Sequence, residues 1–168
     1  NYGTAIFKGE HVLQSGGYVI KGTASGATIL GVFNGCFYID PTSKKPTYSN
    51  YYPGSINVTS AGSISGSTNI DAYIYDDPYM LFEAQCDGTI AKTDIGKNTD
   101  TVLTAGSTVN GLSKNEIDDS TEATTAGLQV KIIGITKDPE NDDASSANAN
   151  WYVMFNEHVK LGTGITGT

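Results

Sequence analysis

The chain has 168 residues, a net charge of −8 and a sequence pI of about 4.5, and all ten of its basic residues are lysines. Nucleic-acid binding needs clustered positive charge, and arginine is the usual bidentate reader of phosphate and guanine. We therefore expect no nucleic-acid partner. A chain of this length buries roughly 70% of the surface that it exposes when unfolded, so its core needs no metal or disulfide.

The first 28 residues are punctuated by glycines, with short apolar pieces between them and no helical period. This pattern is typical of extended backbone, and it leaves two alternatives open. The segment is either an arm that becomes ordered by adding to the edge of another sheet, or a set of ordinary hairpin strands of the same domain.

From residue 29 onward, short apolar segments alternate with turn signals. They predict strands at residues 29–39, 70–75, 79–86, 89–93, 101–105, 126–136 and 151–155. Asp87-Gly88, between the third and fourth of these segments, predicts a hairpin turn. Residues 113–120 predict one short helix, and residues 58–69 are a Ser/Gly-rich stretch that forms either a loop or a weak strand pair.

Together these elements predict an all-β fold, an antiparallel β-sandwich or barrel with an extended Gly-rich N-terminal arm. We place the arm at residues 1–28, the sandwich or barrel domain at residues 29–160 and a flexible tail at residues 161–168. No stretch approaches the ~20 apolar residues of a membrane helix, and the start carries no basic-then-apolar signal peptide. We therefore expect no membrane partner and, for a complete chain, maturation in the cytoplasm.

Cys36 and Cys86 are the only cysteines, and both lie in apolar, strand-like surroundings. One interpretation is a pair of buried thiols that act as small hydrophobic side chains. The other is a disulfide, which would indicate an oxidising compartment.

Residue types that carry catalysis are scarce. His11 and His158 are the only histidines, neither has a neighbourhood typical of a catalytic base, and no nucleophile elbow or phosphate loop occurs. Residues 138–143 supply oxygens of the kind that calcium prefers, but their spacing is not that of an EF-hand, so this segment favours a solvated acidic loop. Asp118-Asp119 is likewise more typical of a turn than of metal ligands. We expect no catalytic residue, no enzyme activity, no cofactor and no metal, and leave calcium binding by residues 138–143 open.

Tyrosines are concentrated in the first half of the chain, with three of them between Tyr48 and Tyr52. Tyr48, Tyr51, Tyr52 and Tyr79 suit either of two roles. They can form a platform on which sugar rings stack, or they can anchor a protein interface, since tyrosine gives a large contact area at low entropic cost.

Several short segments follow one another in a recognisable order. They are Gly31-Val-Phe-Asn-Gly-Cys36, Tyr38 with Asp40-Pro41, Tyr48-Ser-Asn-Tyr-Tyr-Pro53, Asp76-Asp-Pro78, Phe82-Glu-Ala-Gln-Cys-Asp-Gly88, Asp94-Ile-Gly-Lys-Asn98 and Phe155-Asn-Glu-His158. In this order they resemble a family of small structural proteins of tailed bacteriophages, the head decoration or cement proteins. The resemblance covers residues 29–158, and none of its motifs is a catalytic signature.

The resemblance implies a decoration or cement protein that binds the outer surface of a tailed-phage head and stabilises the lattice of the major capsid protein. The expected partners are the major capsid protein and neighbouring copies of the chain, as a trimer or another homo-oligomer. The expected location is the outer capsid surface of the virion, after assembly in the host cytoplasm. The candidate contact residues are Tyr2, Ile6, Phe7, Tyr18, Tyr48, Tyr51 and Tyr52.

A secreted carbohydrate-binding or adhesin-type β domain is the alternative function. The Ser/Thr/Asn-rich composition, the tyrosine cluster and the acidic loop would suit it, and a disulfide between the two cysteines would favour it.

Overall fold

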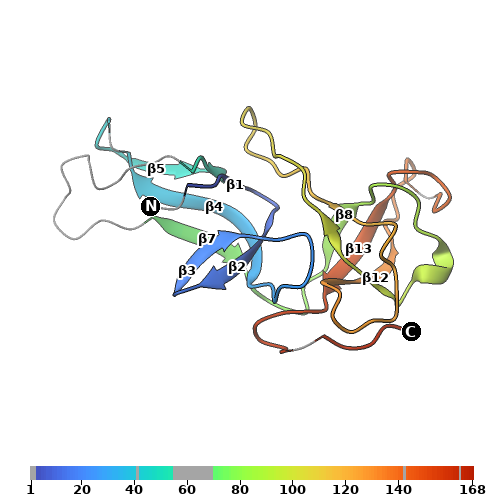
Figure 1. Ribbon diagram of the computed structural model, residues 1–168. Coiled ribbons are helices and arrows are strands. Elements are labelled where there is room, and N and C mark those ends of the chain that lie inside the picture. The colour runs from blue at the N-terminus through green and yellow to red at the C-terminus, as the bar shows by residue number, and fades with distance from the viewer. Residues whose placement is uncertain (1–2, 41, 55–69, 142, 163) are drawn as a thin grey trace. The chain divides into compact units, whose positions relative to one another are not determined.

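The computed structural model describes residues 3–40, 42–54, 70–141, 143–162 and 164–168 of the chain (Figure 1). Its regular elements in these residues are β-strands, apart from one short 3₁₀ turn, η1 (Lys92–Asp94), and the strands pair in antiparallel sheets. The predicted all-β class is therefore confirmed. No helix within the described residues has the length and apolar character needed to cross a membrane.

The chain folds into two compact units, each assembled from separate stretches of sequence. Unit 1 consists of Asn1–Lys21, Gly31–Asp76 and Ala105–Lys114, and unit 2 consists of Gly22–Leu30, Asp77–Thr104 and Asn115–Thr168. The borders of these units do not coincide with the expected arm, domain and tail. Local sequence patterns indicate strands, but they do not indicate which distant strands pair.

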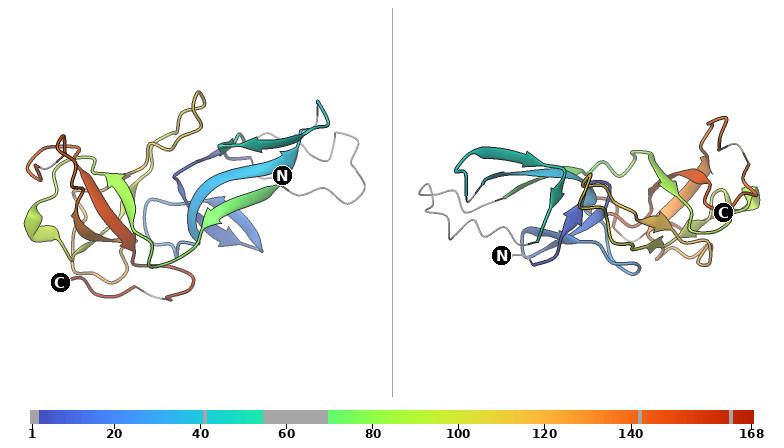
Figure 2. Two further views of the ribbon diagram at one scale, coloured as in Figure 1. Left: turned by 180° about the vertical axis from the view of Figure 1, so that it is seen from behind. Right: turned by 90° about the horizontal axis from the view of Figure 1, so that it is seen from above.

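Unit 1 is built on a five-stranded sheet with the long strand β4 (Gly31–Ile39) at its centre (Figures 1 and 2). One edge of β4 pairs with β7 (Asp71–Tyr75). The other edge pairs first with β2 (His11–Ser15) and then with β5 (Pro46–Ser49), while β3 (Tyr18–Lys21) extends the sheet beyond β2. A separate short pair joins β1 (Ile6–Phe7) to β6 (Tyr51–Tyr52).

Residues 6–21, within the expected arm, form strands of unit 1. The β2–β3 hairpin is fastened by Glu10, whose buried carboxylate accepts hydrogen bonds from the Lys21 Nζ at 2.9 Å and the Phe7 backbone N–H at 3.1 Å. A buried carboxylate is tolerated only when it is paired in this way. This pairing corresponds to the hairpin alternative, and contact between residues 1–28 and a neighbouring molecule stays a prediction.

Unit 2 contains a four-stranded antiparallel sheet and one further short strand pair. In sheet order the four strands are β8 (Phe82–Gln85), β13 (Asn150–Phe155), β12 (Val130–Ile135) and β9 (Asn98–Thr99), and the pair is β10 (Thr101–Val102) with β11 (Glu116–Ile117). The strands predicted near β12 and β13 are confirmed. In β13, Trp151, Val153 and Phe155 alternate with more exposed residues and are buried, as the two-residue period of a half-buried strand requires.

Two local predictions for unit 2 are wrong. Residues 79–93 do not form a hairpin, because β8 pairs with β13 and no strand covers residues 89–93. Residues 113–120 contain strand β11 instead of a helix, with Ile117 fully buried. In both places long-range strand pairing and burial override a local turn or helix signal.

Each unit has its own apolar core. The larger buried hydrophobic residues of unit 1 are Ile6, Phe7, Val12, Leu13, Phe33, Cys36 and Tyr52. Those of unit 2 are Ile29, Cys86, Ile90, Ile117, Val130, Ile132, Trp151, Val153 and Phe155. Fully burying one such side chain contributes about 1.5–3 kcal/mol, so two separate cores of this size are each a substantial source of stability.

The expected tail is hydrogen-bonded to unit 2 near its end. The Ile165 N–H donates to Asn156 Oδ1 at 2.9 Å, and the Ile165 carbonyl accepts from Asn98 Nδ2 at 2.8 Å. The Thr168 N–H donates to the Gly96 carbonyl at 3.0 Å. These hydrogen bonds place Ile165 and Thr168 against unit 2, and the flexibility of residues 161–168 stays a prediction.

One glycine of β4 is required by a close approach. Gly35 has a φ of 124°, and its pairing partner on β7 is Tyr73. A Cβ at this position would lie 2.8 Å from the Tyr48 ring carbon Cζ and 2.8 Å from the Ser49 carbonyl oxygen. The Tyr48 ring therefore lies over the glycine, and its hydroxyl donates to the Asn34 carbonyl at 2.5 Å.

Replacing Gly35 by alanine should lower the free energy of unfolding by about 2 kcal/mol or more, because the methyl group meets Tyr48 and the backbone conformation is strained. Gly134 in β12 is the matched control, since a Cβ there meets nothing within 4 Å and its φ is not positive. The free energy of unfolding of Gly134→Ala should stay within about 0.5 kcal/mol of the wild-type value or be slightly higher. Denaturant unfolding measures both, and equal losses would contradict the packing of Tyr48 over Gly35.

Candidate functional site

The predicted contact residues separate into buried and exposed groups. Ile6, Phe7 and Tyr52 are in the core of unit 1, and Tyr51 is partly buried with its ring stacked on Phe7 at a centroid distance of 5.3 Å. The exposed candidates are Tyr18, at 75% of its possible exposure, and Tyr48, at 52%. Tyr2 lies outside the described residues. The buried residues stabilise unit 1, so among the described candidates Tyr18 and Tyr48 are the ones with well-exposed side chains.

Three tyrosines gather on one face of the unit 1 sheet, and we call Tyr48, Tyr73 and Tyr75 the tyrosine face. Tyr73 and Tyr75 are two residues apart on β7 and therefore point to the same side. Tyr48 comes from β5, and its ring centroid lies 5.9 Å from that of Tyr73. Tyr73 and Tyr75 remain 47% and 45% exposed. An exposed aromatic surface of this kind is typical of binding sites for proteins or sugars.

Tyr73 and Tyr75 were missed as candidates by sequence reasoning. The alternation of residues 70–75 predicts the strand correctly, but alternation alone does not tell which of its two faces is covered. The informative signal is the exposed, polar Asp71 in the same alternating set as both tyrosines. It places that set on the solvent side of the strand.

Charge and tyrosine are unevenly distributed between the two units. Unit 1 carries five lysines and four acidic residues, a net charge of +1, whereas unit 2 carries five lysines and fourteen acidic residues, a net charge of −9. Eight of the ten tyrosines belong to unit 1. The high tyrosine content and low net charge of unit 1 are typical of protein surfaces that make contacts, whereas the many acidic residues of unit 2 are typical of a strongly solvated surface.

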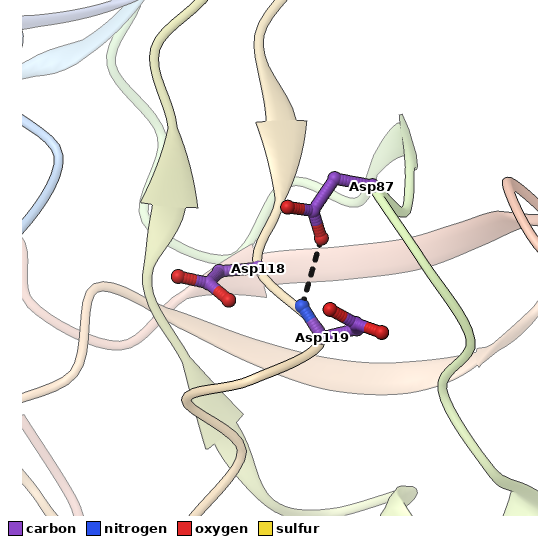
Figure 3. Close-up of side chains that lie close together, drawn as sticks. All are labelled: Asp87, Asp118 and Asp119. Carbon is purple, nitrogen blue, oxygen red and sulfur yellow. Dashed lines mark hydrogen bonds between the residues drawn. The ribbon is translucent and has the colours of Figure 1, made fainter.

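The carboxylates of Asp87, Asp118 and Asp119 in unit 2 form one acidic cluster, with one oxygen of each within 4.8 Å of the others (Figure 3). Asp87 Oδ1 accepts a hydrogen bond from the Asp119 N–H at 2.9 Å, and Asp119 Oδ2 accepts one from the Thr89 N–H at 2.9 Å. Asp118 Oδ1 accepts from the Ser120 N–H at 2.8 Å. These hydrogen bonds connect the loop at residues 87–89 to the loop at residues 118–120. The two loops are close together, since a Cβ at Gly88 would collide with the Asp119 carboxylate.

The acidic loop at residues 138–143 uses its side chains in a similar way. Asp138 Oδ1 accepts from the Glu140 N–H at 2.9 Å, and Asp143 Oδ1 accepts from the Ser145 N–H at 2.9 Å. Asn141 bridges the ends of β12 and β13, with its Oδ1 accepting from the Asn150 N–H at 2.6 Å. Asp142 is outside the described residues. The observed contacts are those of turn-forming side chains.

His158 has a structural position in unit 2. Its ring is fully buried, with Nε2 2.9 Å from the Leu30 carbonyl oxygen and Nδ1 accepting from the Lys160 N–H at 3.1 Å. These two bonds assign the proton to Nε2. The ring also stacks on Phe155 at a centroid distance of 5.5 Å. His158 thus joins the segment before β4 to the chain after β13.

Cys36 and Cys86 are buried free thiols. Burial raises the pKa of each to about 11, so both are neutral at physiological pH. The structure therefore agrees with the interpretation of the cysteines as small buried hydrophobic side chains. The secreted alternative loses the disulfide that would have favoured it.

Comparison with family models, with curated proteins and with solved structures gave no match for this chain. Its function is therefore argued from its own residues and surfaces.

Three carboxyl groups of unit 2 should make the protein more stable in mild acid. Burial raises the pKa values of Asp100, Glu122 and Glu157. Each of these groups binds its proton more tightly in the folded than in the unfolded state. The free energy of unfolding therefore falls as pH rises from about 4, the unfolded value, through the raised folded values.

The melting temperature should accordingly rise when pH is lowered from 7 toward 4.5. Asp100→Asn keeps an oxygen that can accept the Gln129 N–H. The melting temperature of this variant should rise less than that of wild type, because one of the three titrating groups is gone. Thermal unfolding followed by circular dichroism at several pH values measures this. A wild-type melting temperature that falls over this interval would contradict the prediction.

Both thiols should resist modification in the native protein. Because they are buried and neutral, Ellman's reagent should label neither Cys36 nor Cys86 until the chain is unfolded, when two thiols per chain should react. Absence of reactive thiols after unfolding without reductant would show a disulfide and restore the secreted alternative.

Proposed function

We propose that this chain is a decoration or cement protein that binds the outer surface of a tailed-phage head and stabilises the lattice of the major capsid protein. The proposal rests on the resemblance of residues 29–158 to that class of protein and on one structural observation. That observation is the tyrosine face, an exposed aromatic surface on the sheet of unit 1, whose net charge is +1.

The tyrosine face suits a protein partner. Its side chains are held by the sheet, and Tyr48 is fixed further by its hydrogen bond to the Asn34 carbonyl. Fixed tyrosines lose little conformational entropy on binding, which is why they are enriched at protein interfaces. A standard interface buries ~1,600 Å² in total, and many copies bound across subunit joints add their contacts to the whole lattice.

The charge of the chain suits the outside of a DNA-filled shell. A strongly acidic unit is repelled by nucleic acid, and it keeps neighbouring copies soluble before they bind. Unit 1, with a net charge of only +1, carries no such electrostatic cost when it approaches a protein surface.

A secreted carbohydrate-binding domain is the second candidate, because the ring pair Tyr48–Tyr73 would also accept a sugar ring. The two candidates differ in what binds the chain. Only the first requires a particle with regularly spaced copies.

The proposal is tested with an antibody against the chain, used to isolate whatever particle carries it from the source material. Electron cryo-microscopy should show the chain at regular positions on the outside of an icosahedral shell. Shells stripped of the chain should lose DNA at lower temperature than complete particles, and adding the purified chain should restore their stability. Recovery of the chain without any particle, together with binding on a glycan array, would instead establish the sugar-binding candidate.

A further inference from the structure

Strand β7 has an unpaired edge. It pairs with β4 on one side, and among the residues that the structure describes no strand pairs with its other side. Figure 2 shows β7, in green, beside β4 in unit 1. An open edge of this kind is a template on which another strand can pair.

The direction of the backbone groups identifies which of them this edge offers. The Tyr75 carbonyl points toward β4, since a Cβ at Gly31 would collide with it. Backbone groups alternate in direction along a strand, so those of Tyr73 also face β4, whereas the N–H and C=O groups of Ala72 and Ile74 point outward. Within the described ranges, no backbone hydrogen bond from another segment reaches Ala72 or Ile74.

The other two edge strands of this sheet carry features that oppose strand addition. Pro46 begins β5 and has no N–H to donate, and Lys21, at the end of β3, is paired with the buried Glu10 carboxylate. Prolines, lysines and inward-pointing charges are the usual protection of a sheet edge. Strand β7 contains neither proline nor lysine, and its one charged residue is Asp71 at its start. Its edge is therefore the least protected of the three.

The sequence of β7 is complementary to a second copy of itself. When two β7 strands pair antiparallel about a two-fold axis at Tyr73, Ala72 of each copy lies opposite Ile74 of the other, and each such pair exchanges both of its outward hydrogen bonds. On the tyrosine face, Tyr73 then lies opposite its own counterpart, and opposed aromatic side chains stabilise a strand pair. Because the axis repeats every contact, each favourable pair is formed twice.

The charges of β7 do not oppose this pairing. Asp71 lies opposite Tyr75 of the second copy, so the two Asp71 side chains are ~14 Å apart along the strands, at ~3.4 Å per residue. This separation exceeds the screening length of ~8 Å at physiological ionic strength. Asp76, which follows the strand, comes opposite Ile70 and so faces no second carboxylate. Unit 1 as a whole has a net charge of only +1, so two such units approach each other at little electrostatic cost.

We propose that two copies of the chain associate through their β7 edges, in an antiparallel pair centred on Tyr73 that joins their five-stranded sheets into one. This inference goes beyond the proposed function and does not depend on it, because it concerns the chain alone. The tyrosine faces of the two copies then form one aromatic surface with the two Tyr73 rings at its centre. A single pair of short strands is a small interface, below the ~1,200 Å² of stable complexes, so the dimer is in equilibrium with the monomer.

The register is tested with cysteines on the tyrosine face. In a non-hydrogen-bonded pair the two Cα atoms are ~4.5 Å apart, a distance that a disulfide spans. Under mild oxidation with copper phenanthroline, Tyr73→Cys should therefore form a covalent dimer. Tyr75→Cys is the matched control and should not, because its two copies lie ~14 Å apart. A mixture of Tyr75→Cys with Asp71→Cys, which opposes two cysteines and keeps Tyr73, should cross-link again.

The native cysteines do not interfere with this test. Cys36 and Cys86 are buried free thiols, so the wild-type chain should give no cross-linked dimer under the same conditions.

The backbone ladder is tested by adding Ala72→Pro to the Tyr73→Cys variant, since proline removes an outward N–H from each copy. Ala72→Thr is the matched control, because it keeps the N–H and favours a strand. Cross-linking should slow about tenfold or more with proline, the loss expected for roughly one backbone hydrogen bond, and stay close to its starting rate with threonine. Thermal unfolding checks each variant first. The cysteine comparison stands by itself if Ala72→Pro does not fold.

Sedimentation of the unmodified chain completes the test. The fraction of dimer should rise with protein concentration, and a chain that stays monomeric up to about 1 mM would overturn the inference. Equal cross-linking of Tyr73→Cys and Tyr75→Cys would indicate random collision and would also overturn it, as would a cross-linking rate that a folded Ala72→Pro variant leaves unchanged. None of these results bears on whether the chain binds a capsid, so the proposed function is judged separately.

Discussion

Unit 1 depends on hydrogen bonding along both edges of β4. Val32 is paired with His11 on one side and Tyr75 on the other, and Cys36 is paired with Ser49 and Ala72. A strand enclosed in this way contributes its inward side chains to the core and leaves no edge of its own exposed. Among the described residues, the outer strands of this sheet are therefore the shorter strands β3, β5 and β7.

The same enclosure sets what β4 can contain. Its centre must let the Tyr48 ring lie against the backbone, and only a residue without a side chain allows this, so Gly35 occupies this position at the register shift between β4 and β7. The glycine fixes where Tyr48 lies, and Tyr48 in turn contacts Tyr73. The position of the tyrosine face thus follows from the packing of one backbone position in the central strand.

Sequence reasoning predicts those parts of the fold that depend on short-range pattern. The all-β class and the strands near β4, β7, β12 and β13 follow from apolar or alternating segments. Long-range pairing is not encoded in such patterns, so the sequence predicts a local hairpin for β8 although its partner is β13, and it does not indicate the division into two units. For the same reason, the sequence indicates Tyr48 as a contact candidate but not Tyr73, which becomes its neighbour only through β4. Contact of Tyr48 with a partner stays a prediction.

The abundance of acidic residues in unit 2 has a structural explanation that fits the division between the units. Many of its connections have no regular structure, and aspartates such as Asp87, Asp119, Asp138 and Asp143 supply the acceptors that their backbone N–H groups need. Loops built in this way accumulate negative charge, which opposes close approach of a second acidic surface. Since unit 1 forms its loops with fewer acids, it is the part of the chain on which a partner can bind at the lower electrostatic cost.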